Sequence, residues 1–281
     1  MSVGEHAPAK VNLVLQVGPR GGDGRHELCS LFASIELEDR VELHPAPDGE
    51  DAVICPGVEG ENLASRALRL FREAAPDAEL GPVQVEIDKA IPVAAGLGGG
   101  SADAAAVLRA ANRLAGHPLS GQDLLALAVR LGSDVPSQLR PGHAIVTGGG
   151  ELVEPVALQA IDLVLLPQEQ GLATAEVYGE LDRLRAAGEL TPPAALDPEP
   201  LRQLARHTGL QLATALENDL EAAALSLRPE LADGLAALEQ LGALAARVTG
   251  SGPTLFGVFA SASEADAAAR ELPAAIATRT R

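Results

Sequence analysis

The feature that most constrains the fold of this chain is a glycine-rich run between a strand-like segment and a helix-like segment. Apolar and polar residues alternate in 83–88, which predicts a half-buried strand that ends at Asp88. An alanine-rich segment with helical spacing follows in Ser101–Leu114, and four glycines lie between the two, in 96–100. Successive glycines let backbone N–H groups approach an anion without obstruction by Cβ atoms, and a helix N-terminus adds unpaired donors. The run therefore predicts an anion-binding loop.

The residue order in this run differs from two familiar phosphate-binding fingerprints. No Gly-Lys-Ser/Thr follows, so the run is not a Walker A loop. Counting from Gly96, Ser101 takes the place of the third glycine of the dinucleotide fingerprint, and seven residues separate the strand from the loop. A plain strand-to-helix connection with Ser101 as helix cap is the alternative, but four glycines are more than such a connection needs.

A second glycine-rich run, Gly250-Ser-Gly-Pro-Thr254, joins two predicted strands near the end of the chain. A plain turn often needs a single glycine. The run is equally consistent with such a turn and with a second wall of the same phosphate cleft.

The composition narrows the class of partner. There are 21 basic and 39 acidic residues, which gives a net charge of −18. An acidic surface repels nucleic acid and anionic membranes, so neither is expected as a partner. The two cysteines indicate no disulfide framework, and neither they nor the six histidines have a metal-ligand spacing. The N-terminus shows no basic segment followed by an apolar run, so a cytoplasmic location is expected.

Lysine is rare in this chain. Only Lys10 and Lys89 are lysines among the 21 basic residues, and the others are arginines. A position that keeps lysine where arginine is so preferred indicates a need for a compact ammonium. The alternative is that both lie by chance on a solvated surface, and for Lys10 an exposed strand edge is the simpler interpretation. Asp134 follows a predicted helix, where a turn residue is more common than a catalytic base.

The remaining pattern predicts an α+β chain of two lobes, 1–158 and 159–281. The first lobe alternates strands with glycine-rich turns, with a loop expected in 18–24. Strands are predicted in 10–17, 31–43, 161–166, 246–249 and 254–259; helices are predicted in 62–73, 124–131, 173–187, 201–205, 220–225 and 231–241, with a final helix from 263.

Several motifs together resemble one family, in order and spacing along the whole chain. They are Pro8-Ala-Lys-Val-Asn-Leu13, Asp23-Gly-Arg-His-Glu-Leu28, Glu61-Asn-Leu-Ala-Ser-Arg-Ala67, the run from Pro92 to Ala102, Gly132-Ser-Asp-Val-Pro136 and Thr249-Gly-Ser-Gly-Pro-Thr254. This set is similar to the GHMP kinase superfamily, and within it to the branch that phosphorylates a cytidylylated methylerythritol. The glycine run alone names only the superfamily, whereas the histidine and asparagine–leucine motifs indicate the branch.

The resemblance implies a two-lobe GHMP kinase fold, with a first lobe like domain 2 of ribosomal protein S5, a ferredoxin-like second lobe, and the active site between them. It implies ATP and Mg²⁺ as cofactors, with Ser101 as the protein neighbour of the metal. A monomer or a homodimer is expected. The residues expected to bind ATP are Asn62, Leu63, Lys89, Pro92, Gly96, Leu97, Gly98, Gly99, Gly100, Ser101 and Ala102.

For catalysis, the resemblance implies that Asp134 takes a proton from the 2-hydroxyl of the acceptor and that Lys10 stands beside it. A carboxylate next to an ammonium is a sensible pair for this task. Asn12 and His26 correspond to residues that hold the acceptor, with His26 at the edge of the cytosine. The family has a tyrosine where this chain has Arg25, one of two rings that sandwich the base, and Tyr178 corresponds to the other ring. A guanidinium can stack on a base, so Arg25 is the residue on which cytidine recognition depends.

Two alternatives remain open. The first is another kinase of the superfamily, acting on homoserine, a sugar or a mevalonate-like alcohol, which dependence on the cytosine of the acceptor would distinguish. The second is a nucleotide-binding regulator without turnover. The presence of both Lys10 and Asp134 argues against the second, and a failure to release ADP would support it.

Overall fold

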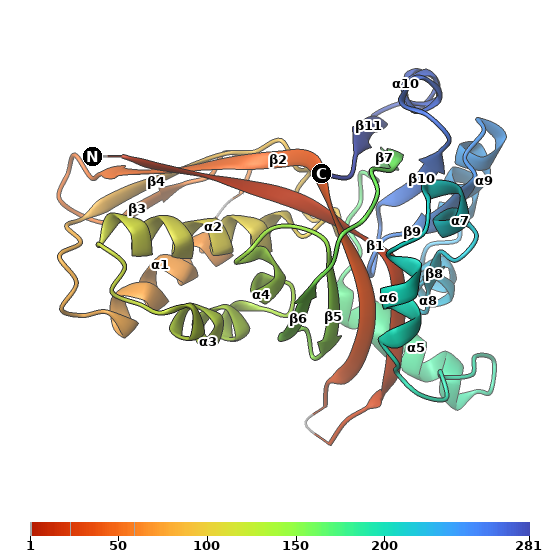
Figure 1. The fold of residues 1–281 in the computed structure, drawn as a ribbon, viewed down its shortest axis with the longest axis horizontal. Helices are drawn as coiled ribbons and strands as arrows, with labels where there is room; N and C mark the ends of the chain where they lie inside the picture. The colour runs from red at the N-terminus through yellow and green to blue at the C-terminus, as the bar shows by residue number, and fades with distance from the viewer. Residues whose placement is uncertain (1, 23, 59) are drawn as a thin grey trace. The chain divides into compact units, whose positions relative to one another are not determined.

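The computed structural model describes residues 2–22, 24–58 and 60–281, which fold into two compact units (Figure 1). The long strands β1 (Val3–Arg20) and β2 (His26–Pro45) contribute residues to both. Unit 1 consists of Met1–Ala9, Leu37–Val93 and Gly98–Pro141; unit 2 consists of Lys10–Glu36, Ala94–Leu97 and Gly142–Arg281. This division does not coincide with the predicted lobe boundary near residue 158, which stays a prediction.

The sheet of unit 1 forms around the strand that the alternating pattern predicts. This strand, β4 (Val83–Asp88), pairs antiparallel with the second half of β2 and parallel with the short β3 (Ala52–Ile54). Its apolar residues Val83, Val85 and Ile87 are buried, while its polar residues are more exposed, which confirms the half-buried strand.

Helices cover one face of these strands. Figure 1 shows α1 (Leu63–Ala74) and α2 (Gly99–Leu114) side by side. They are followed by α3 (Gly121–Leu131) and the short α4 (Val135–Gln138). Every alanine of α2 is buried, so the helix itself forms much of the core. The prediction that α2 begins at Ser101 is wrong by two residues, because Gly98 is the N-cap and makes the turn with a φ of 73°.

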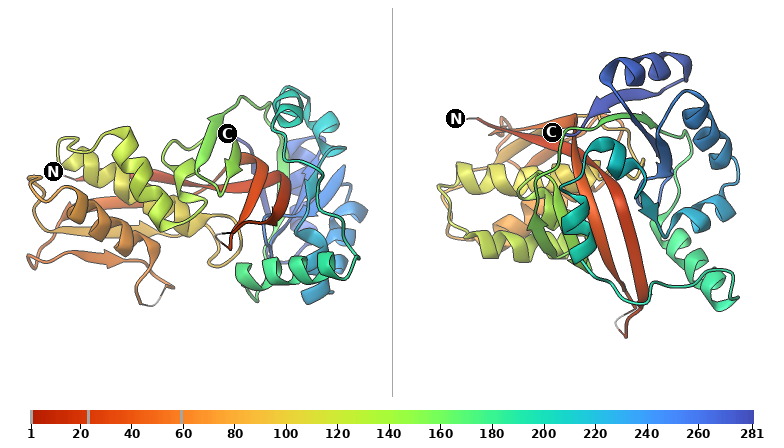
Figure 2. Two further views of the ribbon diagram at one scale, coloured as in Figure 1. Left: turned by 90° about the horizontal axis from the view of Figure 1, so that it is seen from below. Right: turned by 45° about the vertical axis from the view of Figure 1, so that its right-hand side comes forward.

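In unit 2, β1 and β2 run side by side as hydrogen-bonded neighbours (Figure 2). The first half of β2 pairs with β5 (Ala144–Gly148), which forms a hairpin with β6 (Leu152–Pro155). The two-residue strand β8 (Glu217–Asn218) lies parallel to β1. The predicted loop in 18–24 is wrong for its first three residues, which continue β1, and Asp23 lies outside the described residues.

The rest of unit 2 contains a four-stranded sheet in the order β11-β7-β10-β9. In chain order its strands are β7 (Asp162–Leu166), β9 (Ala245–Val248), β10 (Leu255–Phe259) and β11 (Ile276–Arg279). The order is therefore fourth, first, third, second, all antiparallel, which is the ferredoxin-like arrangement. This result confirms the expected fold of the second lobe, although β11 rather than a helix is the last element.

The helices of unit 2 confirm the predicted ones with shifted ends. In chain order they are α5 (Thr174–Ala186), α6 (Glu199–Leu204), α7 (Gly209–Ala213), α8 (Glu221–Leu227), α9 (Leu231–Gln240) and α10 (Ala262–Glu271). The short α7 was not predicted. Helices α9 and α10 pack on the four-stranded sheet, as the blue segments of Figure 2 show. Across the residues that the structure describes, no helix is both long and apolar enough to cross a membrane.

The core of unit 1 gives a first test of this fold. Phe71 is one of four phenylalanines in the chain and is 1% exposed in the core between α1 and α2. Its replacement by alanine should lower the free energy of unfolding by about 3–5 kcal/mol, because a large cavity is left behind. Urea denaturation followed by circular dichroism measures the loss. Val129→Ala, at a side chain 40% exposed on α3, should change stability by less than about 0.5 kcal/mol, and an equal loss in both variants would contradict the packing described.

Candidate functional site

In unit 2, the two glycine-rich runs touch through their backbones. A Cβ atom added to Gly96 would lie 2.4 Å from the carbonyl oxygen of Gly252 and 3.4 Å from that of Thr249. Gly96 also has a φ of 77°, which favours glycine. The next carbonyl, that of Leu97, accepts a hydrogen bond of 3.0 Å from the backbone N–H of Lys10. The second run is therefore more than a plain turn, because it packs against the first run beside the strand that carries Lys10.

In unit 1, the rest of the first run leads directly into α2. The backbone N–H of Ala102 donates to the carbonyl oxygen of Gly98 at 2.9 Å, which is the first step of the helical ladder. The N–H groups of the three preceding residues, Gly99–Ser101, have no acceptor within the helix. The first turn carries no acidic side chain and no side-chain cap. A helix N-terminus of this kind attracts an anion.

A buried ion cluster lies directly behind this helix end. Lys89 donates to Asp39 at 2.5 Å and to Asp103, on α2, at 2.8 Å. The other oxygen of Asp39 accepts the N–H groups of Ala90 and Ile91 at 2.7 and 2.8 Å. The cluster therefore ties β2, the segment before the glycine run and the first turns of α2 to one another. Neither aspartate was singled out from the sequence.

The cluster shares one cation between two carboxylates. Burial, and then the charge of Asp39, raise the pKa of Asp103 from its ordinary value of 3.8 to about 7, although the attraction of Lys89 lowers it. One oxygen of Asp103 is buried and has no hydrogen-bond partner among the described residues. The pKa of Asp103 is raised because ionising two buried carboxylates beside a single ammonium costs free energy.

Most of the residues expected to bind the nucleotide lie in unit 1, whereas Gly96 and Leu97 belong to unit 2. A Cβ atom on Gly99 would lie 3.3 Å from the Lys89 Nζ atom, and one on Gly100 would lie 3.8 Å from Leu63. Asn62 is the N-cap of α1, and its side-chain oxygen accepts from the N–H and hydroxyl of Ser65. Its amide nitrogen is therefore the end of the side chain that can still donate to a ligand. Pro92 is half-buried and Ala102 is buried.

Lys10 is buried in unit 2, with 4% of its surface exposed, so the exposed-edge interpretation is wrong. Its Nζ atom donates to the Asn12 side-chain oxygen at 2.7 Å and lies 4.9 Å from the centre of the Phe32 ring. The hydrogen bond and the cation–π contact compensate part of the cost of removing the ammonium from water.

The second glycine run is held in place by Asn218, which sequence reasoning missed, and by Thr249. Asn218 donates from its amide nitrogen to the carbonyls of Val248 and Gly250, both at 2.8 Å. The hydroxyl of Thr249 accepts the backbone N–H of Asn12 at 3.0 Å. The only sequence signal at Asn218 is an Asn–Asp pair just before a predicted helix, which is typical of a turn.

His26 and Tyr178, two of the residues expected to hold the acceptor, form a ring contact with centroids 5.2 Å apart. The Nδ1 atom of His26 lies 2.9 Å from the carbonyl oxygen of Gly18, and its Nε2 atom lies 3.3 Å from a carboxylate oxygen of Asp182. Arg25 is exposed. The structure thus brings His26 and Tyr178 together, and Asp182 is an addition that the sequence did not indicate.

Asp134 lies in unit 1 at the start of α4. Its backbone carbonyl accepts the hydroxyl of Ser137 at 2.8 Å, but its side chain makes no capping bond to the helix. Its backbone is therefore part of a turn, as the simpler interpretation expected, while its carboxylate does not serve as the helix cap. Lys10 and Asp134 belong to different units.

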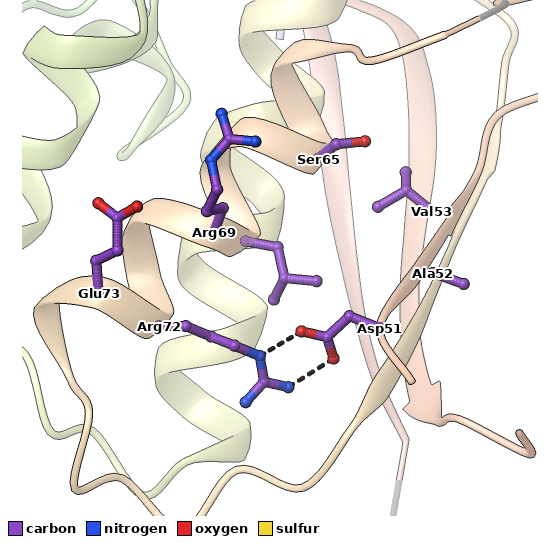
Figure 3. Close-up of a pocket in the computed structure, with 8 residues that line it drawn as sticks. Asp51, Ala52, Val53, Ser65, Arg69, Arg72 and Glu73 are labelled. Atoms are coloured by element: carbon purple, nitrogen blue, oxygen red, sulfur yellow. Dashed lines mark hydrogen bonds and ion pairs between the residues drawn. The ribbon is translucent and has the colours of Figure 1, made fainter. Parts of the chain in front are cut away.

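A pocket of about 470 Å³ lies elsewhere in unit 1, between α1 and β3 (Figure 3). Its charged side chains pair with one another or with near neighbours. Arg72 forms a two-pronged ion pair with Asp51 and also donates to the carbonyl of Leu80, and Arg69 pairs with Glu61. None of the predicted site residues lines this pocket, so its size alone does not make it the site.

Comparison with known proteins identifies the family. Models of the N-terminal and C-terminal domains of GHMP kinases match residues 62–142 and 195–278. The 4-diphosphocytidyl-2-C-methyl-D-erythritol kinase of Mycobacterium tuberculosis (strain ATCC 25618 / H37Rv) is 45% identical over 290 residues, which cover 99% of this chain and 89% of that protein. This chain belongs to the GHMP kinase family.

Other relatives agree with this assignment to the GHMP kinases. A kinase of the same name from Nocardioides sp. (strain ATCC BAA-499 / JS614) is 44% identical, covering 96% of this chain and 92% of that one. A crystal structure of 4-(cytidine 5'-diphospho)-2C-methyl-D-erythritol kinase matches with a TM-score of 0.82 and 35% identity, over 99% of this chain and all of that chain. The L. major mevalonate kinase, at 17% identity and a TM-score of 0.71 over 99% of this chain and 96% of that chain, shares the fold.

The chemistry of the site fits a magnesium ion that is held mainly by a bound phosphate. Among the described residues, no group of three or more His, Cys, Asp or Glu side chains could form a metal cage. Mg²⁺ commonly binds through substrate phosphates, waters and one or two protein oxygens. The hydroxyl of Ser101 follows directly on the free N–H groups of α2 and offers one such oxygen.

The ion cluster predicts a pH dependence of stability. Because the pKa of Asp103 is higher in the folded chain than in the unfolded chain, the folded state binds more protons between about pH 4 and pH 7. The contribution of this group to stability is therefore present at low pH and is lost as the pH rises through that window. Asp103→Asn removes this titration. Between about pH 5 and pH 8, the melting temperature of the wild type should fall relative to that of the variant. If the melting temperatures of the two proteins change with pH in parallel, the pKa of Asp103 is not raised.

Proposed function

We propose that this chain transfers the γ-phosphoryl group of ATP to the 2-hydroxyl of 4-diphosphocytidyl-2-C-methyl-D-erythritol, which gives the 2-phosphate and ADP. The identity of 45% over nearly the whole chain to kinases of that name carries the proposal. The protein is an ATP-dependent small-molecule kinase, and its reaction belongs to the methylerythritol phosphate route to isoprenoid precursors.

The phosphates of ATP bind to the glycine-rich run. The φ of 77° at Gly96 and of 73° at Gly98, and the free N–H groups at the start of α2, support this assignment. The adenine lies against Asn62, Leu63 and Lys89, which is supported by the closeness of Lys89 and Leu63 to the run: a Cβ atom on Gly99 or Gly100 would come within 4 Å of them. The remaining residues of this site are Pro92, Leu97, Gly99, Gly100, Ser101 and Ala102.

Mg²⁺, when bound, neutralises charge on the phosphates, and the hydroxyl of Ser101 is its protein neighbour. The cytidine of the acceptor is held at His26 and Tyr178, whose ring contact supports a shared role. Arg25 takes the place of the second ring, and its planar guanidinium stacks on the base. Asn12 holds the methylerythritol part of the acceptor.

In the reaction, Asp134 accepts the proton of the 2-hydroxyl as that oxygen forms a bond to the γ-phosphorus. The bond between the γ-phosphorus and the oxygen that bridges it to the β-phosphate breaks, and ADP leaves. Lys10 stabilises the ionised carboxylate and the developing negative charge on the attacking oxygen. Few side chains suffice, because phosphoryl transfer depends mainly on positioning and on charge stabilisation.

The lobes of this kinase are 1–158 and 159–281, and the boundary falls between the two matched family domains, which end at 142 and resume at 195. The protein acts in the cytoplasm as a monomer or a homodimer. Its net charge of −18 supports a small-molecule substrate over a nucleic acid or a membrane.

Removal of the proposed base tests the chemistry. Asp134→Ala should lower kcat by about 10²- to 10⁴-fold, because the hydroxyl loses its proton acceptor, while the Kd for ATP should change less than about 3-fold. ADP release measures kcat, and calorimetry measures ATP binding. Asp233→Ala, at an exposed aspartate of α9, is the control and should leave both unchanged. A kcat of Asp134→Ala close to that of the wild type would remove Asp134 as the base.

A substitution in the glycine run tests the nucleotide site. Gly98→Val should weaken ATP binding at least about 10-fold, because a β-branched residue at a φ of 73° displaces the N–H groups that follow. Gly121→Val, at a helix start where an added Cβ meets nothing within 4 Å, should not affect the affinity. An unchanged Kd for ATP in Gly98→Val would place the phosphates elsewhere.

A further inference from the structure

A chain of hydrogen bonds links the ammonium of Lys10 to the backbone of β1. Lys10 Nζ donates to the Asn12 side-chain oxygen at 2.7 Å, and the Asn12 amide nitrogen donates to the hydroxyl oxygen of Ser30 at 2.9 Å. The Ser30 hydroxyl donates to the carbonyl oxygen of Val14 at 2.5 Å. Lys10, Asn12 and Ser30 are 4%, 3% and 0% exposed, so water cannot replace these bonds easily.

The direction of every bond in this chain is fixed by chemistry. A carbonyl can only accept, so the single proton of the Ser30 hydroxyl points to Val14 and leaves the Ser30 oxygen as an acceptor. The side of the Asn12 carboxamide that faces Ser30 must therefore be its nitrogen. An ammonium can only donate, so the oxygen of the carboxamide must face Lys10. The two ends thus demand the same orientation of Asn12.

Thr249, in the second glycine run, also contacts Asn12. Its hydroxyl accepts the backbone N–H of Asn12 at 3.0 Å and lies 3.5 Å from the Asn12 side-chain oxygen. In the orientation set by Ser30 and Lys10, the hydroxyl donates toward this oxygen, so the contact is compatible with that orientation.

We propose that Ser30 is a positioning residue of the kinase reaction, which fixes the carboxamide of Asn12 and thereby the position of the Lys10 ammonium. The inference rests on the proposed role of Lys10 in catalysis. Without the Ser30 hydroxyl, the Asn12 nitrogen loses its hydrogen-bond acceptor, and the carboxamide is fixed at its oxygen alone and turns more easily. A turned carboxamide would present N–H groups to the ammonium and displace it from its catalytic position.

The chain offers a matched pair of serines for the test. Ser34 lies on the same strand as Ser30 and is 2% exposed, but its hydroxyl has no hydrogen-bond partner among the described residues. Ser30→Ala and Ser34→Ala therefore remove the same atom from the same strand. The first alone breaks the hydrogen-bond relay that runs from Lys10 through Asn12 and Ser30 to Val14. A general effect of emptying a buried hydroxyl site would appear in both variants.

Two readouts are needed, hydrogen exchange of the Asn12 side-chain amide by NMR and steady-state kinetics. In Ser30→Ala, exchange should accelerate and kcat should fall, each about 10-fold, which corresponds to the loss of one buried hydrogen bond. The KM for ATP should change less than about 2-fold, since the side chains of Ser30 and Asn12 bond to Val14, Lys10 and one another rather than to a residue of the nucleotide site. Ser34→Ala should behave as the wild type in all three.

The outcomes separate this inference from the proposed function. The exchange measurement needs no alcohol substrate, so it shows whether the relay exists even if the enzyme phosphorylates a different alcohol. Unchanged exchange in Ser30→Ala would overturn the relay, and faster exchange with unchanged kcat would overturn its role in the reaction. In an Asn12→Ala background, Ser30→Ala should lower kcat no further, and an additional loss there would show that Ser30 does not act through Asn12.

Discussion

Each unit of this protein removes a lysine ammonium from water, and a buried charge is tolerated only where polar groups surround it. In unit 2, Lys10 is compensated by Asn12 and by the ring of Phe32. In unit 1, Lys89 is compensated by Asp39 and Asp103. These are the only two lysines in a chain with a net charge of −18. The two ammonium groups that the proposed reaction needs are thus held by local contacts, although the net charge of the chain is negative.

In each unit, the backbone of the glycine-rich run packs closely against other groups of the protein. Gly96 has no room for a Cβ atom because the carbonyl of Gly252 is so near, and Gly99 lies against Ile91 and Lys89. Small residues let supporting groups come close to the backbone. The run is therefore a packing surface, and in the proposed function it is also the surface that binds phosphate.

Local patterns in the sequence predicted what local physics determines. The helical spacing of α1 and α9 and the alternation of β4 are visible in a single segment, and so are the glycines of the phosphate run. The hairpin β5–β6, the two-residue β8 and the final β11 were missed, because short strands owe their existence to partners far away in the chain. The residues that support the site were missed for the same reason. Ser30 and Asp39 look like ordinary polar residues of a strand, and their partners are found only after the chain has folded.

The central claim is that the protein phosphorylates a cytidylylated acceptor although Arg25 stands where its family has a tyrosine. The most direct test is ADP release by the purified protein with Mg·ATP, comparing 4-diphosphocytidyl-2-C-methyl-D-erythritol with free methylerythritol, homoserine and mevalonate. We expect turnover with the cytidylylated acceptor alone. Equal or faster turnover with an acceptor that lacks cytidine would contradict the assigned substrate, and no turnover with any acceptor would contradict the kinase itself.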